Sequence, residues 1–213
     1  MAGLWQSAGA LVAPAGAPPE VVRRASLGLG QFFPIVTDTP HASVLDLGCV
    51  WQATVAAFTG AGCKLYTEDL FEALHRGLRQ PPAKSALPAP PLAERFLAPV
   101  LRYPPGSFRG ILLWDLFDYL PEELVLPLRD RLDALLIPGG ALLALFHNRP
   151  PQETSFSRCR VADAETLELV PAPLPLQRQR VFQNRAMVSL FASYRTARTF
   201  VGRDTLRELL VVK

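Results

Sequence analysis

The chain has 213 residues, which is enough for one domain with a substantial buried core. Hydrophobic residues make up 49% of it and charged residues 19%, a composition that excludes a disordered chain and a membrane-embedded one. The net charge of +3 is small and the arginines are scattered, so nucleic-acid binding is not indicated.

The N-terminal residues 1–18 are rich in Ala, Gly and Pro and carry no Lys or Arg before their apolar run. They predict a loose leader and neither a signal peptide nor a membrane span, and we expect a single domain over residues 19–213. The cysteines Cys49, Cys63 and Cys159 have no CxxC spacing, which argues against a disulfide framework or a zinc site. No metal is therefore expected, and a reducing cytoplasm is the predicted compartment.

A strand–helix–strand unit is predicted early in the chain. Residues 19–36 place apolar side chains at helical spacing and predict an N-terminal helix. SVLDLG (43–48) then predicts a buried strand, ATVAAFTGAG (53–62) a helix and CKLYTED (63–69) a second strand. Two strands joined by a helix over this length indicate a parallel sheet with a right-handed crossover.

The middle of the chain continues the alternation after a proline-rich interruption. Residues 80–92 predict a loop, and FLAPVLRY (96–103) predicts a weak strand. A buried strand is expected over Gly110–Asp115, followed by an amphipathic helix that Gly139 and Gly140 end. ALLALFHN (141–148) predicts another buried strand.

The last third predicts further strands and one helix. Two strands are expected within 159–174, a short helix capped by Asn184, and a closing strand pair over 195–202 and 206–213. Together the elements predict an α/β fold with a doubly wound, mostly parallel seven-stranded sheet, helices on both faces and an antiparallel C-terminal strand. In such sheets a ligand sits beyond the carboxyl ends of the strands.

Four stretches carry a resemblance to a known family. They are VLDLGC (44–49), YTEDL (66–70), GSFRGILLWDLFDYLP (106–121) and LLIPGGALLALF (135–146). In this order and spacing they resemble the class I S-adenosylmethionine-dependent methyltransferases. The resemblance covers residues 40–148, which would form the cofactor-binding core, and the last strand of residues 149–213 also resembles the family. It implies a Rossmann-like fold, S-adenosylmethionine as cofactor and methyl transfer to an unidentified acceptor, expected to be a small molecule.

The resemblance also implies a cofactor site at the first two strand ends. Asp46 would orient the turn or take up the ligand's ammonium group, and Gly48 would supply the tight bend. Asp69 would accept hydrogen bonds from ribose hydroxyls, with Glu68 in its place if the register slips by one residue. Cys49 lies in the turn as a ligand contact or as a small buried side chain.

The region after the fourth strand of the family borders both the cofactor and the methyl acceptor. Trp114, Asp115, Asp118 and Tyr119 are the candidates there, with Trp114 and Asp115 on the cofactor side. Methyl transfer needs alignment and, for a protonated acceptor, a base. Asp115, Asp118 and His147 are the candidate bases, while Asp115 and Asp118 are equally expected to cap the helix that follows.

The first turn departs from the family pattern. Val50 and Gln52 stand where the family carries glycines, and the resemblance puts Val50 against the cofactor. Side chains there would occupy cofactor space or force a different backbone path. The acid that often contacts adenine has no counterpart near Leu97, and the family's amine-methylating signature is absent after the fourth strand. The alternatives are therefore a catalytically inactive binding or scaffolding relative, and an α/β protein that binds another nucleotide.

Overall fold

The computed structural model describes residues 20–79, 91–150, 156–173, 176–202 and 204–213. Its strands are β1 (Val22–Ala25), β2 (Ser43–Asp46), β3 (Lys64–Thr67), β4 (Phe108–Trp114), β5 (Leu136–His147), β6 (Phe156–Asp163), β7 (Thr166–Ala172), β8 (Thr196–Val201) and β9 (Leu206–Val212). Its α-helices are α1 (Leu27–Thr37), α2 (Gln52–Gly60), α3 (Leu70–Arg79), α4 (Leu92–Leu97), α5 (Glu122–Leu135) and α6 (Asn184–Leu190), and η1 (Leu116–Tyr119) is a 3-10 helix.

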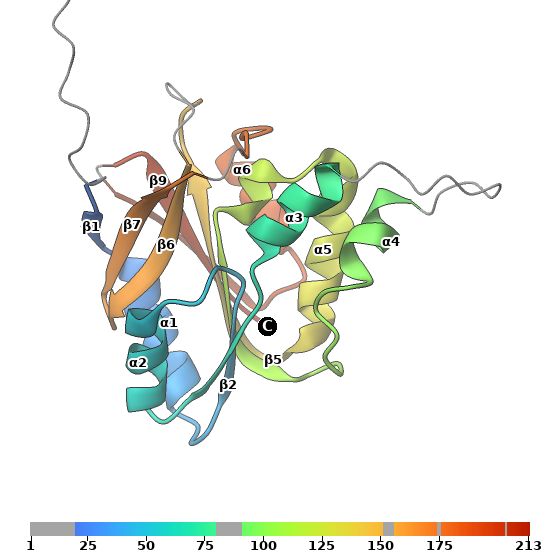
Figure 1. Cartoon of the computed structure of the whole chain (residues 1–213). Helices are drawn as coiled ribbons and strands as arrows, with labels where there is room; N and C mark the ends of the chain where they lie inside the picture. Colours follow the sequence, from blue (N-terminus) through green and yellow to red (C-terminus); the bar gives the residue numbers. More distant parts are fainter. Residues whose placement is uncertain (1–19, 80–90, 151–155, 174–175, 203) are drawn as a thin grey trace, which may run out of the picture.

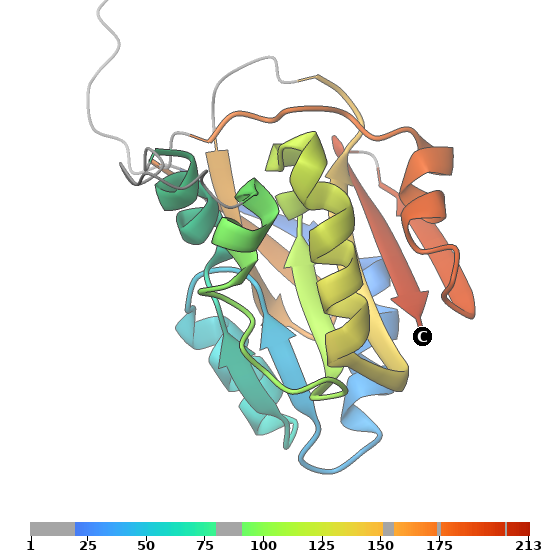
Figure 2. The same cartoon turned by 90° about the vertical axis from the view of Figure 1, so that its right-hand side faces the viewer.

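The main sheet has six strands in the order β3-β2-β4-β5-β9-β8. The first four are parallel to one another, whereas β9 runs antiparallel to β5 and to β8. Helices α1 and α2 lie on one side of the sheet and α5 on the other, where α4 packs on α5 (Figure 1). Figure 2 shows α5 lying across its face of the sheet. The predicted α/β architecture with helices on both faces is confirmed.

The core lies between the central strands and these helices. Strands β4 and β5 are buried along most of their length because helices cover both of their faces, so their sequences read as unbroken apolar runs. An aromatic group follows their carboxyl ends, where the rings of Phe117 and Phe146 stack at 6.2 Å between centroids. This rigid centre fixes the strand ends from which the candidate site is built.

A second sheet, of order β1-β7-β6, is antiparallel. Its strand β6 packs against α2, where the N–H of Val161 donates to the hydroxyl of the fully buried Thr54 at 3.0 Å. Strand β1 is tied to the main sheet by Arg24, whose guanidinium lies 3.0 Å from the buried carboxylate of Glu208 on β9. These contacts hold the small sheet beside the first turn of the main sheet.

The N-terminal helix was expected over residues 19–36, and the structure corrects this. Val22–Ala25 forms β1, and the helix begins at Leu27. Ser26 separates the two elements because its hydroxyl caps the helix by accepting from the N–H of Leu29 at 3.0 Å. The pairing of β1 with the distant β7 is what overrides helical spacing in this segment.

Four further expectations are corrected in the described part of the chain. The main sheet has six strands and not seven, and the strand expected within 96–103 is replaced by the end of α4 and an irregular segment. The glycines at 139 and 140 lie inside β5, because α5 already ends at Leu135. Helix α6 begins at Asn184, but its N-cap position is Gln183. The predicted leader and most of the proline-rich loop lie outside the described residues.

Within the described ranges, none of the helices combines the length and apolar character needed to cross a membrane.

Candidate functional site

The turn after β2 is built around the buried carboxyl of Asp46. Its Oδ1 accepts from the N–H of Gly48 at 2.9 Å and from the indole Nε1–H of Trp114 at 2.6 Å. Burial raises the pKa of Asp46 from 3.8 to about 6, although both hydrogen bonds oppose that rise. A Cβ at Gly48 would lie only 2.8 Å from Trp114 Nε1, so a side chain cannot be accommodated at this bend without a shift. The glycine therefore allows the close approach of Trp114.

Trp114 is placed by an unusual backbone conformation. It is the last residue of β4, is 2% exposed and has a φ of 57°. A bulky residue in the left-handed region carries a cost of about 1–2 kcal/mol, and such positions gather at functional sites. The conformation directs the chain away from the sheet and brings the indole of Trp114 against the turn.

The two departures from the glycine pattern lie on the surface of the turn. Val50 is 70% exposed and Gln52 is also exposed, so both side chains point to solvent. Neither residue has a positive φ. The backbone at these two positions is therefore not left-handed, and the expectation that their side chains would occupy cofactor space stays a prediction.

The turn leaves several backbone donors unused. In the described residues the N–H groups of Cys49, Val50 and Trp51 donate no hydrogen bond. They precede α2, whose first turn adds the positive end of the helix dipole. This edge is thus suited to a carboxylate or another anion. Cys49 is partly exposed, and burial raises the pKa of its thiol.

The two acids after β3 face different neighbours. Asp69 accepts from the guanidinium of Arg158 on β6 at 2.6 Å through Oδ2, and from the N–H of Glu72 at 3.0 Å through Oδ1. Glu68 accepts from the N–H of Leu101 at 2.7 Å. Asp69 is therefore the acid on the side of β6, whereas Glu68 holds the loop before β4.

The candidate bases come together at the ends of β4 and β5. Nδ1 of His147 lies 2.9 Å from Oδ2 of Asp118 and 3.7 Å from Oδ2 of Asp115. Oδ2 of Asp118 also accepts from the backbone N–H of His147 at 2.7 Å. Helix η1 produces this arrangement, because it turns the chain within a few residues of β4 and returns Asp118 towards β5. Neither aspartate caps a helix through its side chain.

Two carboxylate oxygens of this cluster have no hydrogen-bond partner. In the part of the chain that the structure describes, Oδ1 of Asp115 and Oδ1 of Asp118 are both buried and unpaired. Burial raises the pKa of Asp115 from 3.8 to about 6, against the lowering effect of nearby His147. Unpaired buried oxygens cost free energy unless another group satisfies them.

Tyr119, the fourth candidate after β4, forms one wall of the cluster. Its ring packs edge-on against Phe71 and Phe156, and burial together with Asp115 raises the pKa of its hydroxyl. A cavity of about 360 Å³ lies beside it. Its lining residues are His75, Leu78, Arg79, Tyr119, Leu176, Gln177 and Gln179.

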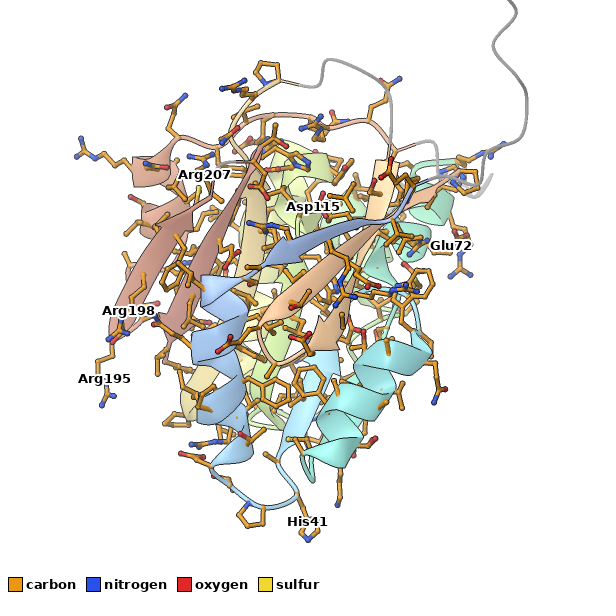
Figure 3. The ribbon with its side chains drawn as sticks, turned by 90° about the vertical axis from the view of Figure 1, so that its left-hand side faces the viewer. His41, Glu72, Asp115, Arg195, Arg198 and Arg207 are labelled. Atoms are coloured by element: carbon orange, nitrogen blue, oxygen red, sulfur yellow. The ribbon has the colours of Figure 1, made fainter. Side chains whose placement is uncertain are left out.

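Sequence reasoning missed two arginines that organise the site. Arg158 reaches Asp69 from β6, 89 residues away along the chain. Arg207 on β9 donates to the carbonyl oxygen of His147 at 3.0 Å and to the carbonyl oxygen of Phe182. Figure 3 shows Asp115 and Arg207 at the same upper end of the molecule. Arg158 lies outside the stretches that resemble the family, and although Arg207 lies in the last strand, its partners are found only in the three-dimensional structure.

Comparison with known proteins supports the fold but no closer relationship. No protein-family model matches the chain, and no curated protein matches it significantly. An S-adenosylmethionine-dependent methyltransferase structure from Archaeoglobus fulgidus aligns over 87% of this chain and 91% of its own, with 11% identity and a TM-score of 0.52. That similarity confirms the predicted methyltransferase-like fold.

Two other solved structures align with lower scores. A methyltransferase from Methanosarcina mazei aligns over 84% of this chain and 97% of its own, with 14% identity and a TM-score of 0.48. The 1,6-didemethyltoxoflavin-N1-methyltransferase of Burkholderia thailandensis, solved with 1,6-didemethyltoxoflavin and S-adenosylhomocysteine bound, aligns over 88% of this chain and 77% of its own. It has 16% identity and a TM-score of 0.48.

Proposed function

We propose that the protein is an S-adenosylmethionine-dependent methyltransferase acting on a small-molecule acceptor. The observation that carries the proposal is the cluster of Asp115, Asp118 and His147, whose buried carboxylate oxygens remain unpaired in the described residues. It lies at the carboxyl ends of β4 and β5, the edge at which sheets of this kind bind their ligands. The methyltransferase-like fold is the second support.

The residues around the first turn fit this cofactor. The free N–H groups of Cys49, Val50 and Trp51 suit the carboxylate of its amino-acid end. Asp69 suits the ribose hydroxyls, provided that Arg158 releases it. When bound, the cofactor would supply a methyl group on a positively charged sulfonium. Asp46 and Gly48 act by shaping the turn, because their polar groups bond to one another.

Asp115, Asp118 and His147 are proposed to handle the proton of the methyl acceptor. The Asp118 carboxylate accepts from Nδ1–H of His147, which leaves Nε2 of the imidazole free to accept a proton. His147 is therefore the proposed base for an acceptor hydroxyl or amine, and Asp118 the residue that orients it. Asp115, with a pKa of about 6, is a second group beside the imidazole that can take up or release a proton.

The acceptor is proposed to be a polar small molecule. The cavity beside Tyr119 offers hydrogen-bonding side chains from His75, Arg79, Gln177 and Gln179. Its volume of about 360 Å³ lies at the lower end of the range for small-molecule sites, which is roughly 300–1,000 Å³. It borders the cluster through Tyr119, whose hydroxyl pKa is affected by Asp115.

A second candidate function is a non-catalytic binding or scaffolding role. It is favoured by one observation: Asp69 is already paired with Arg158, and Asp46 with Trp114. A protein that had lost the cofactor would gain stability from such internal pairs. The two candidates differ in whether the pair formed by Asp69 and Arg158 opens for a ligand.

Thermal unfolding with S-adenosylmethionine or S-adenosylhomocysteine separates the two candidates. For a ligand at a hundred times its dissociation constant, the native state gains about 2.7 kcal/mol, or about 5–10 °C in midpoint for a chain of this size. The methyltransferase proposal expects such a shift with both compounds, and adenosine triphosphate serves as the control nucleotide. A folded protein whose midpoint does not move at millimolar cofactor would support the scaffolding role instead.

A further inference from the structure

A second cavity lies far from the candidate active site. It has a volume of about 630 Å³ and lies between α1 and the strands β8 and β9. Its lining residues are Gly30, Gln31, Pro34, Ile35, Asp38, Arg109, Gly139, Arg195, Thr196, Arg198, Leu210 and Val212. Arg109 and Gly139 stand near the beginnings of β4 and β5, so this cavity is at the amino ends of the parallel strands. The Asp115 cluster is at their opposite ends.

The lining carries an excess of positive charge. Three guanidinium groups, those of Arg109, Arg195 and Arg198, face a single carboxylate, that of Asp38. Arg109 donates to Oδ1 of Asp38 at 2.6 Å and to the carbonyl oxygen of Ile35 at 2.9 Å, so it is held in place and its charge is largely balanced.

The two remaining arginines have no such balance. Among the residues that the structure describes, Arg198 donates to the neutral side-chain oxygen of Gln31 alone, at 2.8 Å. In the described ranges Arg195 has no ion pair with a carboxylate, and the same holds for Arg198. Figure 3 shows both side chains projecting from the same edge of the molecule, below the level of Asp115. Because guanidinium groups match phosphate and carboxylate geometry, two arginines without an ion pair in the described ranges that line the same cavity favour an anionic ligand.

The remaining walls are apolar. Pro34 and Ile35 of α1 and Leu210 and Val212 of β9 also line the cavity. The cavity thus combines charged and apolar side chains in its lining, as sites that bind organic molecules usually do. An inorganic ion alone would leave the apolar walls without a partner.

We propose that this cavity, lined by α1, β8 and β9, binds a small organic anion, with its phosphate or carboxylate group on Arg195 and Arg198 and its apolar body against Pro34, Ile35 and Leu210. The site is separate from the proposed methyltransferase site and does not depend on it. A regulatory ligand or a second substrate-sized metabolite would both have this chemistry.

Amide chemical shifts of the isotope-labelled full chain test the proposal. The probes are phenyl phosphate, benzoate and, as the uncharged control, phenol. Saturable binding of either anion with shifts at Gln31, Gly139 and Thr196 is the expected result. Binding of phenol as tight as that of the anions would overturn the proposal, because charge would then play no part. Shifts centred on residues 46–50 would also overturn it.

A matched pair of double variants tests the arginines. Arg195→Gln with Arg198→Gln should weaken the binding of the anion by about tenfold or more, since charge-assisted hydrogen bonds are lost. Arg76→Gln with Arg185→Gln removes the same charge from exposed arginines outside the cavity and should leave the affinity unchanged. All four arginines are exposed, so both variants should fold. Their unfolding midpoints check this. An equal loss of affinity in the two variants would mean that only the net charge of the protein matters, and it would contradict the proposal.

Discussion

The indole N–H of Trp114 donates to the buried carboxyl of Asp46 at 2.6 Å, and this bond joins the ends of two neighbouring parallel strands. It fixes the shape of the turn from which the proposed cofactor site is built. Because Asp46 is almost fully buried, the bond also compensates part of the cost of placing a carboxyl there.

Trp114→Phe should therefore destabilise the fold by about 2–4 kcal/mol, because it removes a hydrogen bond to a buried carboxyl and part of the packed ring. Trp51→Phe is the matched control, since Nε1 of Trp51 has no partner in the described residues and its removal costs no hydrogen bond. Chemical denaturation of both variants measures the difference. Equal losses of stability would mean that the bond to Asp46 contributes little.

The raised pKa of Asp115 should make the free energy of unfolding depend on pH. Its value is raised from 3.8 to about 6, so between these values the folded protein holds a proton that the unfolded chain has lost. The favourable contribution of the protonated carboxyl is thus present below pH 4 and is lost as the pH rises through 6. The side-chain amide of Asp115→Asn does not titrate, so the variant lacks this pH-dependent contribution.

The unfolding free energy of Asp115→Asn relative to wild type should therefore rise by about 2–3 kcal/mol between pH 4 and pH 7. Asp46 titrates alike in both proteins, so its effect cancels in this difference. Urea unfolding at several pH values measures it. A difference that stays constant over this interval would show that Asp115 has an ordinary pKa.

The exposed departures in the first turn can be tested directly. Val50→Gly with Gln52→Gly introduces the glycines that the resemblance to class I methyltransferases implies at these positions, where both side chains are exposed. We expect the affinity for S-adenosylhomocysteine to stay within about twofold, while the added chain flexibility costs about 1 kcal/mol of stability. Calorimetric titration and denaturation measure the two effects. Markedly tighter binding would show that these side chains obstruct the site after all.

Arg158 should act as a competitor for Asp69. Arg158→Gln frees the carboxylate and is expected to tighten S-adenosylhomocysteine binding several-fold. Arg23→Gln is the matched control, because Arg23 lies on β1 of the same small sheet, pairs with Asp163 and Glu168, and should leave the affinity unchanged. Weaker binding by Arg158→Gln would mean that Arg158 contacts the ligand itself.

Much of the fold could be predicted because its signals are local. The apolar runs of β2, β4 and β5 and the glycine at position 48 follow from neighbouring residues alone. The meeting of Asp115, Asp118 and His147 could also be anticipated, since parallel strands bring their carboxyl ends to one edge.

Non-local contacts explain what could not be predicted. Strand β1 forms because it pairs with β7, more than a hundred residues later in the chain. The pattern of apolar residues within Val22–Ala25 does not predict that partner. Residues 96–103 have strand-like composition, but α4 forms at their start and packs on α5. Arg158 finds Asp69 only after β6 is placed beside the first turn. In each case tertiary pairing overrides local preference.

The most direct test of the proposed function is a calorimetric titration of S-adenosylhomocysteine into the wild-type protein and into Asp69→Asn. The variant keeps the size of the side chain and an oxygen for the N–H of Glu72, but it weakens acceptance from ribose hydroxyls. We predict saturable binding by the wild type and a loss of affinity of about tenfold or more in the variant. Equal affinities would contradict the placement of the cofactor on Asp69, and the absence of binding to the folded wild type would contradict methyltransferase function.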